Sequence, residues 1–178
     1  MHFSWSKLLL GALVSLAFLF PWQDAHAERI KDFQVDLVLS NSGLLKVSET
    51  VKYDFEKAQR AALYRRIPLC YERHDAARRL TILPLSVKDG DKPMPYTCKL
   101  MGGFANLQIG DNKKMLKGQH IFRLQYDANN AVNFFDNQAE LFWSCLGTEL
   151  PLPIDHVKVV LHSPPNVDLS AVKTLSSP

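Results

Sequence analysis

The chain has 178 residues and a formal net charge of +3 at pH 7, with 47% apolar and 22% charged residues. This length suits one ordinary domain. A domain of about 150 residues buries roughly 70% of its unfolded surface, so its core requires neither a metal ion nor disulfides. Beyond the N-terminal region, no segment approaches 18 consecutive apolar residues, which excludes a spanning helix from the rest of the chain.

The first 27 residues have the three parts of a secretory signal peptide. A short start carries one basic side chain, Lys7, and residues 8–20 form an apolar run that is too short to span a bilayer comfortably. Ala25 and Ala27 then provide the small-x-small pattern that signal peptidase cleaves. We therefore expect a signal-peptide helix, cleavage before Glu28, and a protein exported to the periplasm or to the extracytoplasmic face of the membrane.

Strand-like patterns fill residues 28–164, which we expect to form the extracytoplasmic domain. Apolar side chains alternate in residues 33–39 and 45–55, and the turn signal Asn41-Ser42-Gly43 between them predicts a β-hairpin. Further short strand patterns lie at residues 79–87, 94–100, 104–109, 120–126, 131–135, 139–143 and 156–162. Eight to ten short strands predict an all-β fold, an antiparallel β-sandwich. Residues 165–178 are expected to be a linker or a frayed tail.

Prolines and alternation also give local expectations within these segments. Pro93 and Pro95 predict that their strand lies at a sheet edge. Leu83, Leu85 and Val87 are expected on one side of the strand that contains them. Residues 59–64 have room for one helical turn before the next proline.

The three cysteines, Cys70, Cys98 and Cys145, allow at most one disulfide and leave one thiol over. Their spacing does not decide which two would pair, and it lacks the Cys-x-x-Cys pattern of zinc sites. The sequence also contains no nucleophile elbow and no phosphate-binding loop. We therefore predict no catalytic residue, no cofactor and no metal site.

Residues 56–79 carry seven basic and three acidic side chains, and they include six of the eight arginines. Guanidinium groups suit phosphate and carboxylate, so Arg73, Arg78 and Arg79 are candidates for binding lipid headgroups or anionic cell-envelope polymers. The alternative is a solvated loop with a few structural ion pairs. A nucleic-acid partner is not expected, because the protein is exported and this segment has no recognition helix and no regularly spaced aromatics.

Glu49 falls on the apolar face of its strand, where a buried carboxylate is unfavourable unless it is paired. Arg65 or Arg66 is expected to form a structural ion pair with it and to tie the basic segment to the sheet. The alternative is that Glu49 lies near a strand end or bulge and reaches water. The aromatic residues near the C-terminal end are expected in the core rather than in a sugar-stacking platform: Phe134, Phe135, Phe142 and Trp143.

Six motifs, in the same order, resemble the N-terminal extracytoplasmic domain of the YciQ-like predicted membrane proteins, a family of unknown function. They are VSETVKYDF (47–55), LYRRIPL (63–69), IGD (109–111), GQH (118–120) with Tyr126 after it, ELFW (140–143) and GTELPLPI (147–154). The resemblance covers residues 29–164. Arg66 stands where the family pattern has an acidic residue, and Cys145 departs from the pattern after the tryptophan.

The resemblance implies no catalytic residues, and it implies transmembrane helices and a glycine-rich tail after this domain. Because the chain ends at Pro178, two alternatives follow: a truncated form of a membrane-anchored protein, or a protein that has lost its anchor. Our leading hypothesis is a non-catalytic interaction module of the bacterial envelope. Its partner would be an envelope protein, an anionic polymer or a lipid headgroup. The alternative is an envelope glycan hydrolase that uses paired carboxylates.

Overall fold

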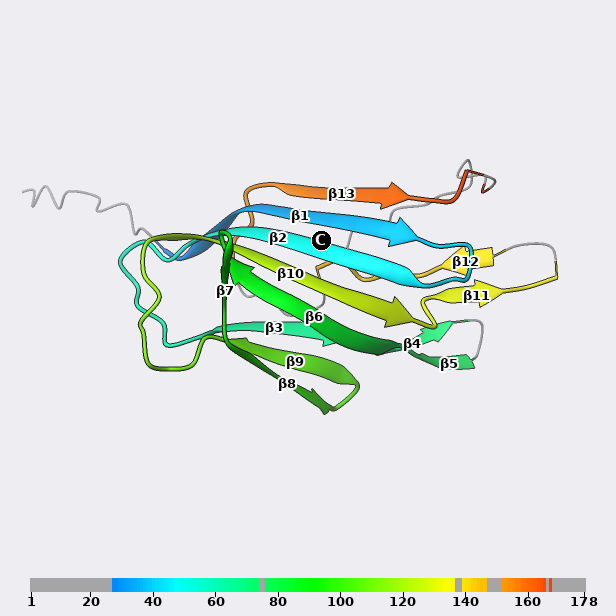
Figure 1. Cartoon of the computed structure of the whole chain (residues 1–178), viewed down its shortest axis with the longest axis horizontal. Helices are drawn as coiled ribbons and strands as arrows, with labels where there is room; N and C mark the ends of the chain where they lie inside the picture. The colour runs from blue at the N-terminus through cyan, green and yellow to red at the C-terminus, as the bar shows by residue number, and fades with distance from the viewer. Residues whose placement is uncertain (1–26, 74–75, 137–138, 147–151, 166, 168–178) are drawn as a thin grey trace, which may run out of the picture.

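The computed structural model describes residues 27–73, 76–136, 139–146, 152–165 and 167, and thirteen β-strands build this part of the chain (Figure 1). The expected all-β fold is confirmed. No helix among the described residues is long and apolar enough to cross a membrane. The expected signal peptide, apart from Ala27, and the end of the expected C-terminal tail lie outside the described residues.

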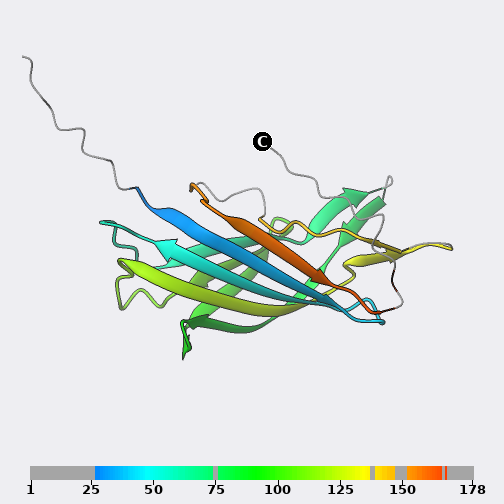
Figure 2. The ribbon, with the colours of Figure 1, turned by 90° about the horizontal axis from the view of Figure 1, so that it is seen from above.

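Six strands form the larger sheet, in the order β13–β1–β2–β10–β6–β7 (Figures 1 and 2). Their bounds are Arg29–Leu39 for β1, Leu45–Asp54 for β2, Thr81–Asp89 for β6, Lys92–Pro93 for β7, Gln119–Asn129 for β10 and Val157–His162 for β13. Neighbouring strands are antiparallel, except that β13 runs parallel to β1. The segment just before β13 lies beside the start of β1. There Ile30 N donates to Pro153 O and Phe33 N donates to His156 O, each at 2.9 Å. The last strand therefore starts beside the start of β1, which makes this pair parallel.

Three further strands form the smaller sheet, in the order β3–β9–β8, and two short ribbons accompany it. The smaller sheet consists of β3 (Leu63–Pro68), β9 (Phe104–Ile109) and β8 (Tyr96–Met101). One ribbon pairs β4 (Cys70–Arg73) with β5 (Ala76–Arg79), and the other pairs β11 (Val132–Phe134) with β12 (Ala139–Leu141). The expected edge position of the proline-containing strand is confirmed, because β7 and β8 each end a sheet.

The predicted hairpin between β1 and β2 is confirmed. Residues 41–43 form its tip, where Ser40 N donates to Leu44 O at 2.9 Å and the Ser40 hydroxyl accepts from Leu44 N at 3.1 Å. Gly43 has a φ of 81°, a conformation that favours glycine. Local turn chemistry and the alternation of the flanking strands therefore agree.

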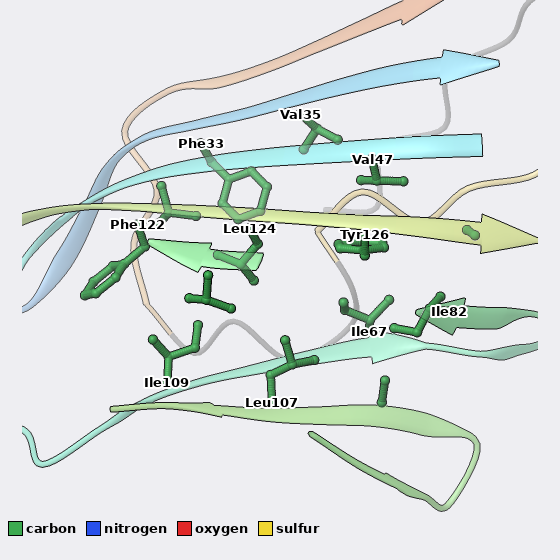
Figure 3. Close-up of a cluster of buried hydrophobic side chains, with 14 of the residues drawn as sticks. Phe33, Val35, Val47, Ile67, Ile82, Leu107, Ile109, Phe122, Leu124 and Tyr126 are labelled. Carbon is green, nitrogen blue, oxygen red and sulfur yellow. The ribbon is translucent and has the colours of Figure 1, made fainter. Parts of the chain in front are cut away.

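The hydrophobic core lies between the two sheets (Figure 3). Alternate residues of β1, β2 and β10 face alternate residues of β3 and β9 across it. Figure 3 labels Phe33, Val35, Val47, Phe122, Leu124 and Tyr126 on one side and Ile67, Leu107 and Ile109 on the other. Among the described residues, those of the core and those packed against it lie between Ile30 and Leu161. A chain that starts at Glu28 therefore retains all of these residues.

Two local expectations are wrong for physical reasons. Leu83 is 57% exposed whereas Val87 is 4% exposed, because the register of β6 against β10 shifts between them and reverses the alternation. Residues 59–64 do not form a helical turn. Arg60 instead bridges to Leu116, and β3 begins at Leu63.

The aromatic residues near the C-terminal end divide between core and surface. The Trp143 ring packs against the core, with its centroid 6.1 Å from that of Tyr126, and Phe142 stacks on Tyr71 at 4.7 Å. Phe134 and Phe135 are 68% and 41% exposed, so their expected core position is wrong. They lie at the end of β11, in the short β11–β12 ribbon, which belongs to neither of the two main sheets.

Candidate functional site

A bidentate ion pair joins Glu49 of β2 to Arg65 of β3. The Arg65 Nε atom donates to Glu49 Oε2 at 2.9 Å, and Nη2 donates to Oε1 at 3.0 Å. Glu49 is 1% exposed and Arg65 is 5% exposed. Alternation explains why they meet, since Glu49 shares a face with Val47 and Arg65 shares a face with Ile67. The ion pair thus connects the two sheets inside their common core.

Further hydrogen bonds occupy the remaining polar atoms of this pair. The Tyr126 hydroxyl donates to Glu49 Oε1 at 2.6 Å. Arg65 Nη1 donates to the carbonyl oxygens of Arg66 at 2.8 Å and Leu146 at 3.1 Å, and Nη2 donates to that of Cys145 at 2.9 Å. The network therefore also fixes the chain segment around residues 145–146 against the sandwich. Arg65 and Tyr126 bind both oxygens of the Glu49 carboxylate and bury it, so a substrate cannot reach this carboxylate.

The electrostatics of this network favour the ion pair and disfavour a reactive thiol. Burial lowers the pKa of the Arg65 guanidinium, but the charge and hydrogen bonds of Glu49 more than offset this effect, so the pKa is raised. Burial and the Glu49 charge raise the pKa of the Tyr126 hydroxyl. They also raise the pKa of the Cys145 thiol. Cys145 therefore stays protonated at neutral pH, which makes it a poor nucleophile.

The structure separates Arg66 from Glu49, although both arginines were candidates to pair with it. Arg66 is next to Arg65 in β3, so it points to the outer face of the smaller sheet. There its guanidinium carbon lies 4.2 Å from the centroid of the Phe104 ring. The alternation of β3 thus decides which arginine enters the core.

The other three candidate arginines lie on the β4–β5 ribbon. In its register Arg73 is opposite Ala76, Arg78 is opposite Tyr71, and Arg79 is opposite Cys70. The side chain of Arg73 lies outside the described residues. Arg78 and Arg79 are both exposed, and neither has a carboxylate partner within the described part of the chain. As strand neighbours they point to opposite faces of the ribbon, so they present charge on both sides rather than in one pocket.

A second polar cluster, which the sequence did not predict, holds the start of β1. Tyr53 Oη donates to Glu28 Oε2 at 2.7 Å, and Arg60 Nε donates to Glu28 Oε1 at 2.8 Å. The hydrogen bond from Arg60 lowers the pKa of the Glu28 carboxyl, and burial partly opposes this. Glu28 is also the first residue after the expected cleavage point. No local pattern reveals this cluster, because its members are 25 and 32 residues apart along the chain.

A histidine–carboxylate pair also lies at the β6–β10 end of the sandwich. His120 Nδ1 lies 2.7 Å from Asp89 Oδ2, and its Nε2 lies 3.1 Å from the carbonyl oxygen of Lys117. A catalytic base would need one ring nitrogen facing a nucleophile. Both nitrogens of His120 face acceptors of the chain itself, so this pair is built as a structural link.

The cysteines and acidic side chains form no metal site in the part of the chain that the structure describes. No group of three or more His, Cys, Asp or Glu residues there is placed to hold an ion. Cys70, Cys98 and Cys145 are all free, so the alternative of one disulfide is not realised.

Comparison with solved structures gives only weak likenesses. Native leukotriene A4 hydrolase from Saccharomyces cerevisiae is 9% identical over 57% of this chain and 15% of its own, with a TM-score of 0.42. An M1 zinc metallopeptidase from Deinococcus radiodurans is 8% identical over 57% of this chain and 20% of its own, with a TM-score of 0.41. The chain thus spans only a small part of the length of either enzyme. Likenesses at this level do not bear on its activity.

No curated protein matches the chain in sequence. A family model does match it, over residues 29–177, and is described as the N-terminal domain of a predicted membrane protein, DUF2207. This range includes both sheets and the Glu49–Arg65 pair between them. The resemblance found in the sequence motifs is therefore confirmed, and the chain belongs to the DUF2207 family of predicted membrane protein N-terminal domains.

Proposed function

We propose that the chain is a non-catalytic interaction domain exported to the extracytoplasmic side of the membrane. The signal-peptide pattern before Glu28 supports export, and the start of the first strand supports cleavage at this point. The cluster of Glu28, Tyr53 and Arg60 begins at Glu28, and β1 begins at Arg29, directly after the small-x-small site. The N-terminus of the protein recovered from the envelope of exporting cells should be Glu28. A full-length N-terminus retained on the membrane would contradict this assignment.

We further propose that the β4–β5 ribbon binds an anionic ligand. The observation that carries this proposal is the exposure of Arg78 and Arg79 without a carboxylate partner among the described residues. Guanidinium groups form paired hydrogen bonds with phosphate and carboxylate. Because the two side chains point to opposite faces, the ligand would be extended, such as a polymer or a surface, rather than one small ion.

Binding of inorganic polyphosphate and of polyglutamate to the chain starting at Glu28 tests this proposal. The variant R73Q/R78Q/R79Q should bind polyphosphate at least about tenfold more weakly than the parent, since it lacks three charge-assisted contacts. The matched control is K113Q/K114Q/K117Q, which removes the same formal charge from exposed positions elsewhere. It should lose less than about threefold.

The salt dependence adds a second criterion. Binding should weaken as ionic strength rises from about 0.01 to 0.15 M, because the Debye length falls from about 30 to about 8 Å. Equal losses in the arginine and lysine variants would show nonspecific charge attraction and contradict the proposal. The absence of binding by the parent would also contradict it, and the ribbon would then be a solvated surface.

A further inference from the structure

The end of the β8–β9 hairpin exposes large apolar side chains on both of its faces. Leu100 pairs with Ala105 and Met101 pairs with Phe104 at the end of the two strands. Adjacent strand residues point to opposite faces, yet Leu100 is 68% exposed and Met101 is 72% exposed. Ala105, which lies opposite Leu100 on β9, is fully buried, so the exposure of both side chains comes from the edge position of β8.

This hairpin end has a fixed shape. Gly102 and Gly103 form its two-residue turn with φ values of 62° and 77°, and positive values at both positions match the tight turn that suits a β-hairpin. The Asn106 Nδ2 atom donates to the carbonyl oxygens of Lys99 at 3.3 Å and Met101 at 3.3 Å. The turn thus fixes the backbone positions that carry the two apolar side chains.

The proposed anion-binding ribbon lies against one side of the hairpin end, and the end itself carries the basic residue Lys99. Leu69 N donates to Gly103 O at 2.7 Å. Cys70 of β4 is also close, since a Cβ added at Gly103 would lie 3.5 Å from the Cβ of Cys70. Cys70 in turn pairs with Arg79. Lys99 is exposed next to Leu100. Figure 1 shows the β8–β9 turn and the β4–β5 ribbon toward the same end of the molecule.

We propose that this hairpin end inserts Leu100 and Met101 into an anionic lipid surface, with Lys99 and Arg79 beside the headgroups. The inference rests on the proposed anion-binding function and names its partner. Exposed apolar side chains on both faces of this sheet edge favour a medium that surrounds the edge, whereas a flat protein partner would cover one face. Apolar groups flanked by basic groups are typical of segments that lie in the membrane interface, and the cations complement anionic headgroups.

Cosedimentation with vesicles tests the insertion, using the chain that starts at Glu28. The vesicles contain phosphatidylcholine alone or phosphatidylcholine with phosphatidylglycerol. The variant L100S/M101S should lose about tenfold or more in its partition to the anionic vesicles, because two large apolar side chains leave the interface. The matched control V38S/L83S removes two apolar side chains that are 47% and 57% exposed on the larger sheet. It should lose less than about twofold.

Fluorescence gives a readout that does not depend on the stability of the serine variant. Tryptophan emission of M101W should shift to the blue with anionic vesicles and be quenched by brominated lipid, while L83W should show neither effect. Unchanged emission of M101W, or equal binding by L100S/M101S and the parent, would overturn the insertion.

Two further outcomes separate this inference from the proposed function. If L100S/M101S loses vesicle binding but keeps polyphosphate binding, the hairpin end acts through lipid, which supports the insertion. If R73Q/R78Q/R79Q loses both ligands while L100S/M101S loses neither, the anion-binding function stands and the insertion is overturned. Self-association that L100S/M101S abolishes, with vesicle binding unchanged, would also overturn it in favour of a second copy of the chain.

Discussion

Arg65 reaches Glu49 from the opposite sheet, and its guanidinium also holds the carbonyl oxygens of Cys145 and Leu146, so one side chain joins three parts of the fold. A buried ion pair has a large desolvation penalty, and excellent geometry with further hydrogen bonds offsets it. This network meets that condition through the bidentate contact and the Tyr126 hydroxyl. Its stability is therefore highly sensitive to the loss of either partner.

Removing one member of the pair should destabilise the fold strongly. We expect Glu49→Ala and Arg65→Ala each to lower the free energy of unfolding by about 3 to 5 kcal/mol, because each leaves a buried charge unpaired. The double variant should lose less than the sum of the two single losses. Denaturant unfolding measures these values. The matched control is Lys52→Ala. It removes a surface ion pair in which Lys52 Nζ lies 3.1 Å from Asp32 Oδ2, and it should change the free energy of unfolding by less than about 1 kcal/mol.

A change under about 0.5 kcal/mol for Glu49→Ala would mean that the carboxylate is solvated rather than paired in the core. Additive losses in the double variant would likewise contradict the coupling between Glu49 and Arg65.

The contribution of Tyr126 can be separated from its packing. Tyr126→Phe keeps the ring between the sheets and removes only the hydroxyl that donates to Glu49 Oε1 at 2.6 Å. Because the acceptor is charged, we expect a loss of about 1.5 to 3 kcal/mol in the free energy of unfolding. Tyr64→Phe is the control, since Tyr64 is 65% exposed, and it should have little effect. Equal effects of the two substitutions would exclude a special role for the hydroxyl.

How far the sequence predicts this fold depends on the distance over which its signals act. The β1–β2 hairpin was predictable because alternation and a turn signal lie within one short stretch. Alternation also put Glu49 on the apolar face. It did not decide between Arg65 and Arg66, because that choice requires the face of β3 that meets the larger sheet.

Other features depend on contacts that no local pattern reveals. The shift in register that exposes Leu83 arises between β6 and β10, which are far apart in sequence. The Glu28–Tyr53–Arg60 cluster and the parallel pairing of β13 with β1 are similarly long-range. Pairings of this kind are set by the packing of the whole domain.

Acid should weaken the fold partly through Asp54. Its carboxylate accepts hydrogen bonds from Lys31 Nζ and Gln119 Nε2, each at 2.9 Å. The bond from Lys31, followed by that from the Glu56 backbone N–H, lowers the pKa of Asp54 despite its burial. A folded-state pKa below the unfolded value, which is about 3.9 for Asp, stabilises the fold above that pH. This contribution is lost as the pH falls through the folded-state pKa.

The difference in unfolding free energy between the parent and Asp54→Asn should therefore shrink as the pH drops below about 4. Denaturant unfolding at a series of pH values measures this trend. Asp91→Asn, at a fully exposed position, is the control and should differ little from the parent at any pH. A difference between parent and Asp54→Asn that stays constant through the acid range would contradict the role of Asp54.

The cysteines should differ in reactivity. Burial raises the pKa of Cys98, and burial together with the Glu49 charge raises the pKa of Cys145, which reduces the reactive thiolate in both. Cys70 is exposed on the β4–β5 ribbon. At neutral pH, iodoacetamide should modify Cys70 at least about tenfold faster than Cys145, as measured by mass spectrometry. The three rates should converge in denaturant, and a Cys145 rate equal to that of Cys70 in the folded protein would count against the buried network.

The claim that the β4–β5 ribbon binds anions is tested most directly by NMR of the arginine side chains. The Nε–Hε signals of Arg78 and Arg79 can be assigned from the single variants R78Q and R79Q. Titration with polyphosphate at low ionic strength should shift these two signals and leave that of the buried Arg65 in place. Unchanged Arg78 and Arg79 signals, in a titration where the parent binds polyphosphate, would place the binding elsewhere and contradict the proposed function.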